Sequence, residues 1–239
     1  MFFVLPVLYV VAIYILAAVL PAVFLMRYIY RQDKVEKEPT MLLLSLVIWG
    51  VAAALASIVL ETIGQSVLGS LLGEDNPAYT IIFAFLVVAV VEEGTKFFFL
   101  KRRTWRDYNF NFRFDGIVYA VFVSLGFAAF ENIRYVLGYG LTVALPRAIL
   151  SIPGHMGFAV FMGLFYGRAK QCENRGDRGG MRRNLCIGYL MAVFLHGFYD
   201  SCAMIGNTLS TALFLAFVVL MYIVVIRMIK RESLRDTPV

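Results

Sequence analysis

Seven apolar runs, each about as long as a helix needs to cross a lipid bilayer, divide this chain from end to end. Roughly 20 apolar residues span the hydrocarbon core of a membrane. Hydrophobic residues make up 61% of the chain and its mean hydropathy is +0.77, which lies outside the range of soluble domains. We therefore predict an all-α, polytopic transmembrane helical bundle that forms a single domain over residues 1–239. The predicted spans lie near residues 2–26, 41–60, 78–100, 115–137, 143–167, 185–205 and 209–229.

The basic residues predict how the bundle is oriented, because Lys and Arg accumulate in cytoplasmic loops. Of the 22 Lys and Arg, 19 fall at 27–37, 101–113, 168–183 and 227–235, which are alternate connections plus the C-terminus. The connection at 61–77 contains three acidic residues and no cation. We expect seven spans with the N-terminus outside and the C-terminus cytoplasmic, in the inner (plasma) membrane. The first span has no basic region before it, so we expect it to be retained rather than cleaved.

The positive net charge of +6 does not indicate nucleic-acid binding. Cations spread over every cytoplasmic loop are the ordinary signature of a membrane protein. The expected surroundings of the chain are therefore the lipid bilayer and other membrane proteins.

Ionisable residues inside the predicted spans are the strongest pointer to function. A charge near the middle of a membrane helix costs about 2.5 to 3.5 kcal/mol on insertion scales, so such a residue is a functional candidate by default. Glu92 and Glu93 lie in the third span with Lys96 one helical turn further on, and both histidines of the chain lie in spans. The complete candidate set is Glu92, Glu93, Lys96, Glu131, Asn132, His155, His196 and Asp200.

Depth along the helices indicates which candidates meet. At about 1.5 Å per residue from the predicted cytoplasmic ends, Glu92 lies about 12 Å deep, His196 about 16 Å and His155 about 19 Å. These three can share one cavity. Glu131 lies about 25 Å deep by the same rise, so we expect it nearer the outer face, at the mouth of that cavity.

Two pairs within single helices favour catalytic use. Glu92 and Lys96 are four residues apart, as are His196 and Asp200, so each pair can interact along its own helix. We expect Lys96 to keep a neighbouring carboxylate ionised and Asp200 to orient the imidazole of His196. The structural alternatives are an ion pair that locks the bundle and histidines that only join helices.

The aligned motifs resemble those of the PrsW-type intramembrane proteases, which are related to the CAAX prenyl endopeptidases. Four motifs occur in order on four successive spans, and the resemblance in order and helix placement extends over residues 28–229. They are Glu92-Glu93-Gly-Thr-Lys96 for EExxK, Phe127-Ala-Ala-Phe-Glu131-Asn132 for FxxxEN, His155, and His196-Gly-Phe-Tyr-Asp200 for HxxxD.

The resemblance implies an intramembrane endopeptidase that cuts a single-pass membrane protein. The substrate implied by the family is an anti-sigma factor that receives its first (site-1) cut here. Release of the sigma factor then switches on stress-response genes.

The favoured mechanism is hydrolysis by glutamate-activated water, which requires no cofactor. Glu92 or Glu93 acts as general base while Lys96 holds the other carboxylate. His155 and His196 face the water and the oxyanion, and Asp200 fixes the tautomer of His196. Glu131 and Asn132 complete the polar wall.

A zinc-dependent version of the same protease is the first alternative, because two histidines and a glutamate form a ligand set of catalytic zinc sites. The sequence contains no HExxH. The second is a proton- or ion-coupled transporter, which also uses intramembrane Glu, Asp and His; the inverted repeat typical of such proteins is not evident. Arg134 and Arg147 are interpreted as interfacial anchors. The metal-ligand candidates are Glu93, Glu131, His155 and His196.

Overall fold

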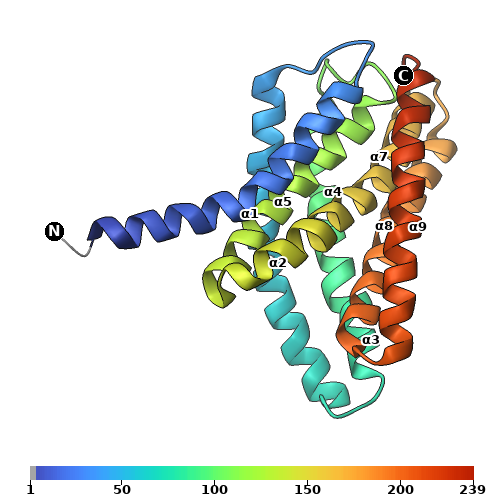
Figure 1. Cartoon of the computed structure of the whole chain (residues 1–239). Helices are drawn as coiled ribbons and strands as arrows, with labels where there is room; N and C mark the ends of the chain where they lie inside the picture. The colour runs from blue at the N-terminus through green and yellow to red at the C-terminus, as the bar shows by residue number, and fades with distance from the viewer. Residues whose placement is uncertain (1–3) are drawn as a thin grey trace.

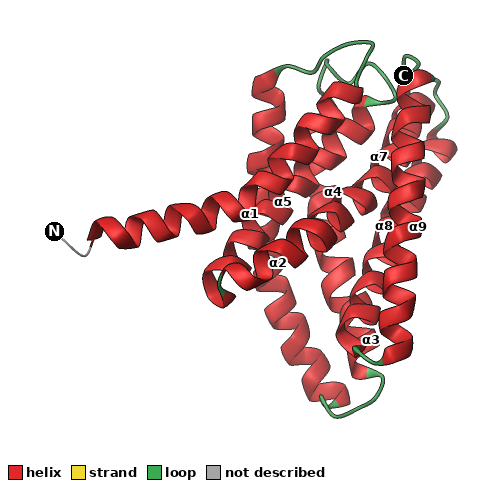
Figure 2. Cartoon of the chain, in the orientation of Figure 1, coloured by secondary structure: helices red, strands yellow, loops and turns green. Residues whose placement is uncertain are grey.

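The computed structural model describes residues 4–239, so residues 2 and 3 of the first predicted span lie outside the described part. Helices joined by short loops make up this part, and it contains no β-strand (Figure 2). The all-α class is therefore confirmed. The main helices are α1 (Val4–Gln32), α2 (Thr40–Leu72), α3 (Tyr79–Ile82), α4 (Val90–Thr104), α5 (Asp115–Tyr139), α7 (Ile152–Asn174), α8 (Arg178–Ile205) and α9 (Thr208–Leu234).

Helix α5 forms the centre of the bundle. Its most apolar stretch is 83% buried, and α1, α2 and α7 all pack against it. Helix α7 also packs on α8, and α8 packs on α9. A helix that is apolar on all sides belongs at such a position. The two helices that carry Glu131 and His155 are thus held against each other in the core.

Six helical segments within residues 4–239 are long and apolar enough to cross a membrane. The third predicted span is not among them, because every 18-residue stretch of the continuous helix at 79–104 includes the three charged residues Glu92, Glu93 and Lys96. This helix starts with α3, passes through η1 (Phe83–Ala89), a π-helical segment, and continues as α4. The count of seven spans and the orientation of the termini remain predictions. The six segments are Leu8–Gln32, Thr40–Leu72, Asp115–Tyr139, Leu141–Asn174, Arg178–Ile205 and Thr208–Leu234.

The connection expected at 61–77 is shorter than the sequence indicated. Helix α2 continues to Leu72 and ends at Gly73, whose φ of 74° is readily adopted by glycine. The loop that follows covers only residues 73–78. Glu61 therefore belongs to a helix and not to a connection.

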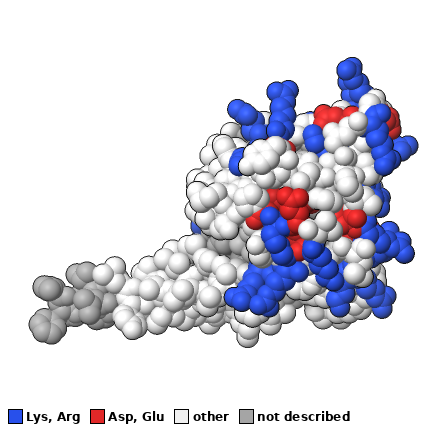
Figure 3. All heavy atoms as spheres, turned by 90° about the horizontal axis from the view of Figure 1, so that it is seen from above, with Lys and Arg blue, Asp and Glu red and all other residues white. Residues whose placement is uncertain are grey.

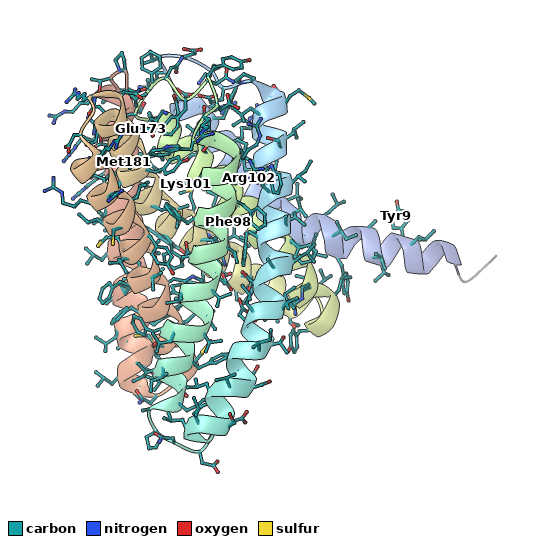
Figure 4. All side chains as sticks on the ribbon, turned by 180° about the vertical axis from the view of Figure 1, so that it is seen from behind. Tyr9, Phe98, Lys101, Arg102, Glu173 and Met181 are labelled. Carbon is teal, nitrogen blue, oxygen red and sulfur yellow. The ribbon has the colours of Figure 1, made fainter. Side chains whose placement is uncertain are left out.

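The loops 33–39 and 105–114 and the C-terminus lie at one end of the bundle, while the turn at 73–78 lies at the other (Figure 1). Viewed from above, the end with the C-terminus has many Lys and Arg side chains on its surface (Figure 3). Lys101, Arg102, Glu173 and Met181 lie toward the same end (Figure 4). The predicted cytoplasmic loops therefore do share one end of the molecule.

The N-terminal half of α1 stands away from the bundle (Figure 1). Tyr9 lies on this projecting part and is 72% exposed (Figure 4). Pro21 lies inside the helix, and the residues from Ala18 onward provide its buried contacts, including Ala22 and Ile29. Only the second half of the first predicted span therefore packs within the bundle.

Glycines allow α5 to approach its neighbours at backbone distance. A Cβ atom at Gly126 would lie 2.4 Å from the carbonyl oxygen of Val47 in α2. A Cβ atom at Gly163 in α7 would lie 2.5 Å from the carbonyl oxygen of Gly116 in α5. These contacts fix the spacing of the helices that carry the polar residues.

Candidate active site

A buried lysine joins the two glutamates of α4. Lys96 Nζ donates to Glu92 Oε2 at 3.0 Å and to Glu93 Oε1 at 2.8 Å. Residues three and four apart on a helix lie on one face, so one ammonium group can reach both carboxylates. Lys96 also lies 4.0 Å from the centre of the Phe127 ring. All three charged side chains are buried, which confirms the expected pairing of Glu92 with Lys96.

The same lysine connects α4 to α7. Lys96 Nζ lies 3.1 Å from His155 Nδ1. Because an ammonium group can only donate, Nδ1 accepts and the ring proton is on Nε2. His155 Nε2 lies 3.0 Å from Glu131 Oε2 and can donate to it. His155 therefore links the α4 cluster to the glutamate of α5.

Glu131 is part of this network rather than a separate group at its mouth. The depth estimate had separated it from His155 because it took no account of tilt. Helix α7 runs obliquely to its neighbours (Figure 1), and the 3.0 Å contact shows that the two side chains meet.

Arg147, interpreted from the sequence as an interfacial anchor, instead belongs to the polar network. Its Nη2 atom lies 3.1 Å from Glu131 Oε2, and its Nε atom donates to Asn132 Oδ1 at 2.7 Å. Asn132 in turn donates to the carbonyl oxygen of Ala18 in α1 at 2.8 Å. Arg147 thus holds both polar residues of the FxxxEN motif. Arg147 lies near the start of the helical segment Leu141–Asn174, which is long and apolar enough to cross a membrane.

His196 of α8 completes the cluster. Its Nδ1 atom lies 2.9 Å from Glu93 Oε1, and its Nε2 atom lies 3.3 Å from Asp200 Oδ2 and 3.9 Å from Glu92 Oε2. The ring of Phe158 stacks on the imidazole with centroids 4.8 Å apart. The expected pairing of His196 with Asp200 is confirmed, although Glu93 makes the shorter contact with the ring.

All eight predicted site residues therefore lie in one connected network, but only some of them face open space. A cavity of about 1000 Å³ lies within the bundle. Glu93, Lys96 and Asn132 are behind its wall. The predicted residues that line it are Glu92, Glu131, His155, His196 and Asp200.

Sequence reasoning missed Glu61, which lines the same cavity from α2. Its Oε1 atom is buried and has no hydrogen-bond partner within residues 4–239. The signal available was Ser57, four residues earlier, which places two polar side chains on one face if α2 is extended past residue 60. Ser57 lines the cavity as well and hydrogen-bonds Thr95 at 2.7 Å.

The donor atoms of this cluster are of the types that bind metals, but a lysine ammonium group lies among them. Ligand atoms of Glu92, Glu93, His155 and His196 all lie within 4.8 Å of one another, and imidazole with carboxylate suits zinc. Glu131, one of the sequence candidates, is not in this group. The Lys96 ammonium group already contacts Glu92, Glu93 and His155, so a metal ion bound to these donors would lie beside a second positive charge. The residues fit a cluster centred on lysine better than a metal centre.

π-helical turns precede two of the motifs. Segment η1 (Phe83–Ala89) ends three residues before Glu92, and η3 (Arg147–Ser151) ends four residues before His155. Such turns are frequent at functional sites, where they adjust the direction of side chains. They appear here on the two helices that Lys96 and His155 connect.

Comparison with known proteins agrees with this architecture. The model of a family described as PrsW family intramembrane metalloprotease matches residues 38–228. The chain is 32% identical to Protease PrsW of Oceanobacillus iheyensis over 91% of this chain and 94% of that protein. It is 35% identical to Protease PrsW of Geobacillus kaustophilus over 77% and 76%, and 30% identical to that of Clostridioides difficile over 87% and 86%. No solved structure matches the chain.

Proposed function

The chain belongs to the PrsW family of intramembrane proteases and is thus a peptidase of bacterial membranes, and from this premise we propose that Glu92 is the general base that activates the attacking water. One observation carries the proposal. Glu92 lines the cavity, whereas Glu93 is fully buried and bonded to both Lys96 and His196. Glu93 is a positioning residue.

The proposed reaction begins with a water molecule beside Glu92. The carboxylate takes one proton from the water, and the oxygen forms a bond to the carbonyl carbon of the substrate peptide. The resulting oxyanion needs hydrogen-bond donors that are already in position. His196 is the proposed donor: Glu93 holds its Nδ1 atom at 2.9 Å, and its Nε2–H group turns from Asp200, the longer contact at 3.3 Å, to the oxyanion in the cavity that the ring lines.

Collapse of the tetrahedral intermediate breaks the carbon–nitrogen bond. The proton held by Glu92 passes to the departing amine, which restores the carboxylate. His155, Glu131 and Arg147 line the same cavity and are proposed to orient the substrate backbone. Bonds, protons and charges balance over this cycle without a cofactor.

We further propose that no metal takes part. Lys96 supplies a fixed positive charge between the two glutamates, the place where a catalytic metal would bind the same donors. The alternative is the zinc-dependent version with His155 and His196 as ligands. The transporter alternative is not favoured by the family match.

The proposed substrate is a single-pass membrane protein, specifically an anti-sigma factor that receives its first cut here. The support is the family resemblance together with the position of the cavity inside a bundle of membrane-spanning helices. A helical substrate has to unwind locally before its peptide bond becomes accessible, because its backbone groups are already hydrogen-bonded to each other.

The test is cleavage of a tagged candidate anti-sigma factor, co-expressed in bacterial membranes with the wild type or with single variants. Glu92→Gln should reduce cleavage about 100- to 10,000-fold, the usual contribution of a general base, and lower the melting temperature less than Glu93→Gln does, because Lys96 keeps Glu93 as its partner. Glu93→Gln should reduce both cleavage and melting temperature, because it breaks a buried network. Glu74→Gln, an exposed carboxylate in the loop after α2, is the matched control and should be neutral.

Full cleavage by Glu92→Gln would exclude Glu92 as the base. Purified protein treated with a chelator should keep its activity and contain no stoichiometric zinc. Activity lost with the chelator and restored by zinc would establish the zinc-dependent alternative.

A further inference from the structure

A second group of buried acids lies at the end of the bundle where the basic loops gather. Asp33 and Glu38 belong to the loop between α1 and α2, and Asp115 is the first residue of α5. Oxygen atoms from all three lie within 4.8 Å of one another. Their exposed fractions are 1%, 4% and 1%. None of them lines the cavity described above.

Buried charges are normally paired or bound to metals, but these three acids lack a cationic partner. No Lys or Arg forms a salt bridge with any of them within residues 4–239. Lys37, in the same loop, donates instead to the backbone carbonyls of Tyr30 and Asp33. Three carboxyl groups thus meet without a counter-charge from the described part of the chain.

Several oxygen atoms around the cluster have no hydrogen-bond partner. Asp33 Oδ2, Glu38 Oε2 and the hydroxyl of Tyr119 are buried and unpartnered within the described residues. Asp115 differs, because its Oδ2 atom accepts from the backbone N–H groups of Asn111 at 3.1 Å and Phe112 at 2.7 Å. Buried polar atoms without partners are rare in proteins, so these oxygen atoms are available to bind a water molecule or an ion.

Burial and nearby negative charges raise the pKa values of both loop acids. Burial raises the pKa of Asp33 to about 6, although Lys37 acts against this, and nearby negative charges including Asp236 add to it. Burial likewise raises the pKa of Glu38 to about 7, and the charge of Asp33 contributes. Both carboxyl groups therefore resist ionisation while no positive charge lies between them.

We propose that Asp33, Glu38 and Asp115 bind a hard divalent cation, Ca²⁺ or Mg²⁺. Sites for these ions consist of oxygen ligands, chiefly carboxylates, carbonyls and water. The cluster contains no histidine or cysteine, so zinc and the later transition metals are disfavoured. The cluster around Lys96 has different donor types, because it combines imidazole with carboxylate.

The position of the site gives the cation a structural role. The ion would fasten the α1–α2 loop to the start of α5. The C-terminal segment attaches to the same region, since Asp236 accepts from the backbone N–H of Phe114 and Val239 donates to Asn111. A cation would thereby stabilise the contacts of three separate stretches of chain at this end of the bundle.

The experiment uses the full-length protein, purified in detergent and stripped with a chelator, then titrated with CaCl₂ or MgCl₂ in separate arms. At about 100 times the Kd, the bound ion should raise the melting temperature by about 5 to 10 °C. Calorimetry should give one saturable site for the preferred ion. Glu38→Gln and Asp33→Asn should each lose the shift and the binding. Glu36→Gln changes an exposed acid of the same loop and should retain both.

Binding is measured without substrate, so the outcome is independent of the proposed proteolysis. Glu93→Gln should keep the cation response, which separates this site from the cluster in the bundle. The proposal fails if neither ion binds saturably to the wild type, or if Glu38→Gln and Asp33→Asn keep the shift. It also fails if these variants have a higher melting temperature than the wild type and the melting temperature of the wild type does not change with either ion. In that case the acids would share protons and not bind a cation.

Discussion

Replacing Gly163 by alanine tests the packing that brings α5 and α7 together. The new Cβ atom would lie 2.5 Å from the carbonyl oxygen of Gly116 and 2.6 Å from the Cα atom of Ile117. Both are backbone atoms, so no side chain can turn away and the two helices have to separate. Overpacking of a core costs about 1 to 3 kcal/mol, and contacts this short put Gly163→Ala at the upper end.

The same substitution at Gly138 is the matched control. Gly138 lies in the last turns of α5, and a Cβ atom added there would have no other atom within 4 Å. Alanine is favoured over glycine in a helix by about 1 kcal/mol, and less near a helix end. Gly163→Ala also gains the higher helix propensity of alanine, so its net cost is about 2 kcal/mol. Gly138→Ala should be stabilised by about 0.5 kcal/mol.

Thermal unfolding of the purified variants measures the difference. For a chain of this size, 1 kcal/mol shifts the melting temperature by about 2 to 4 °C. Gly163→Ala should therefore melt about 4 to 8 °C lower than wild type, and Gly138→Ala about 1 to 2 °C higher. Cleavage should fall in Gly163→Ala, because α5 and α7 carry the 3.0 Å contact between Glu131 and His155. If Gly163→Ala is as stable as Gly138→Ala, the close backbone approach of α5 and α7 is wrong.

Two further predictions concern the polar network. Arg147→Leu should reduce cleavage about 10- to 100-fold by loosening Glu131, with little change in melting temperature; unchanged cleavage in the membrane assay would make the arginine a simple anchor. Lys96→Met leaves two buried carboxylates without their cation and should cost about 3 to 5 kcal/mol, measured by thermal unfolding. The double variant Lys96→Met/Glu93→Gln should recover part of this loss, and a purely additive result would argue against coupling.

The candidate site residues could be selected from the sequence because each is costly in its span. Polar groups inside apolar runs stand out, and spacing of three or four residues reports on neighbours within a helix. Glu92 with Lys96 and His196 with Asp200 were found in this way. The pattern of basic residues likewise indicated which loops share one end.

Contacts between helices were harder to predict, since they depend on tilt and helix length. Glu131 was expected at the mouth of the cavity, and Glu61 was assigned to a connection that proved to be helical. Arg147 was interpreted as an interfacial anchor, because the sequence does not show its contacts with Glu131 and Asn132. The acids at Asp33 and Asp115 are far apart in the sequence, and only the packed structure brings them together.

The π-helical segment η1 affects which side chains of its helix face α8. Phe85 lies against Gly197 of α8, where an added Cβ atom would be 2.4 Å from the Phe85 ring, and Glu93 contacts the adjacent His196. Eight residues of regular α-helix, at about 100° each, would point these two side chains about 80° apart. A wider π turn contains one extra residue. The two side chains then point about 20° apart, with the rotation in the opposite direction. A single added residue thus turns two unrelated stretches of one helix, one aromatic and one acidic, toward the same neighbour.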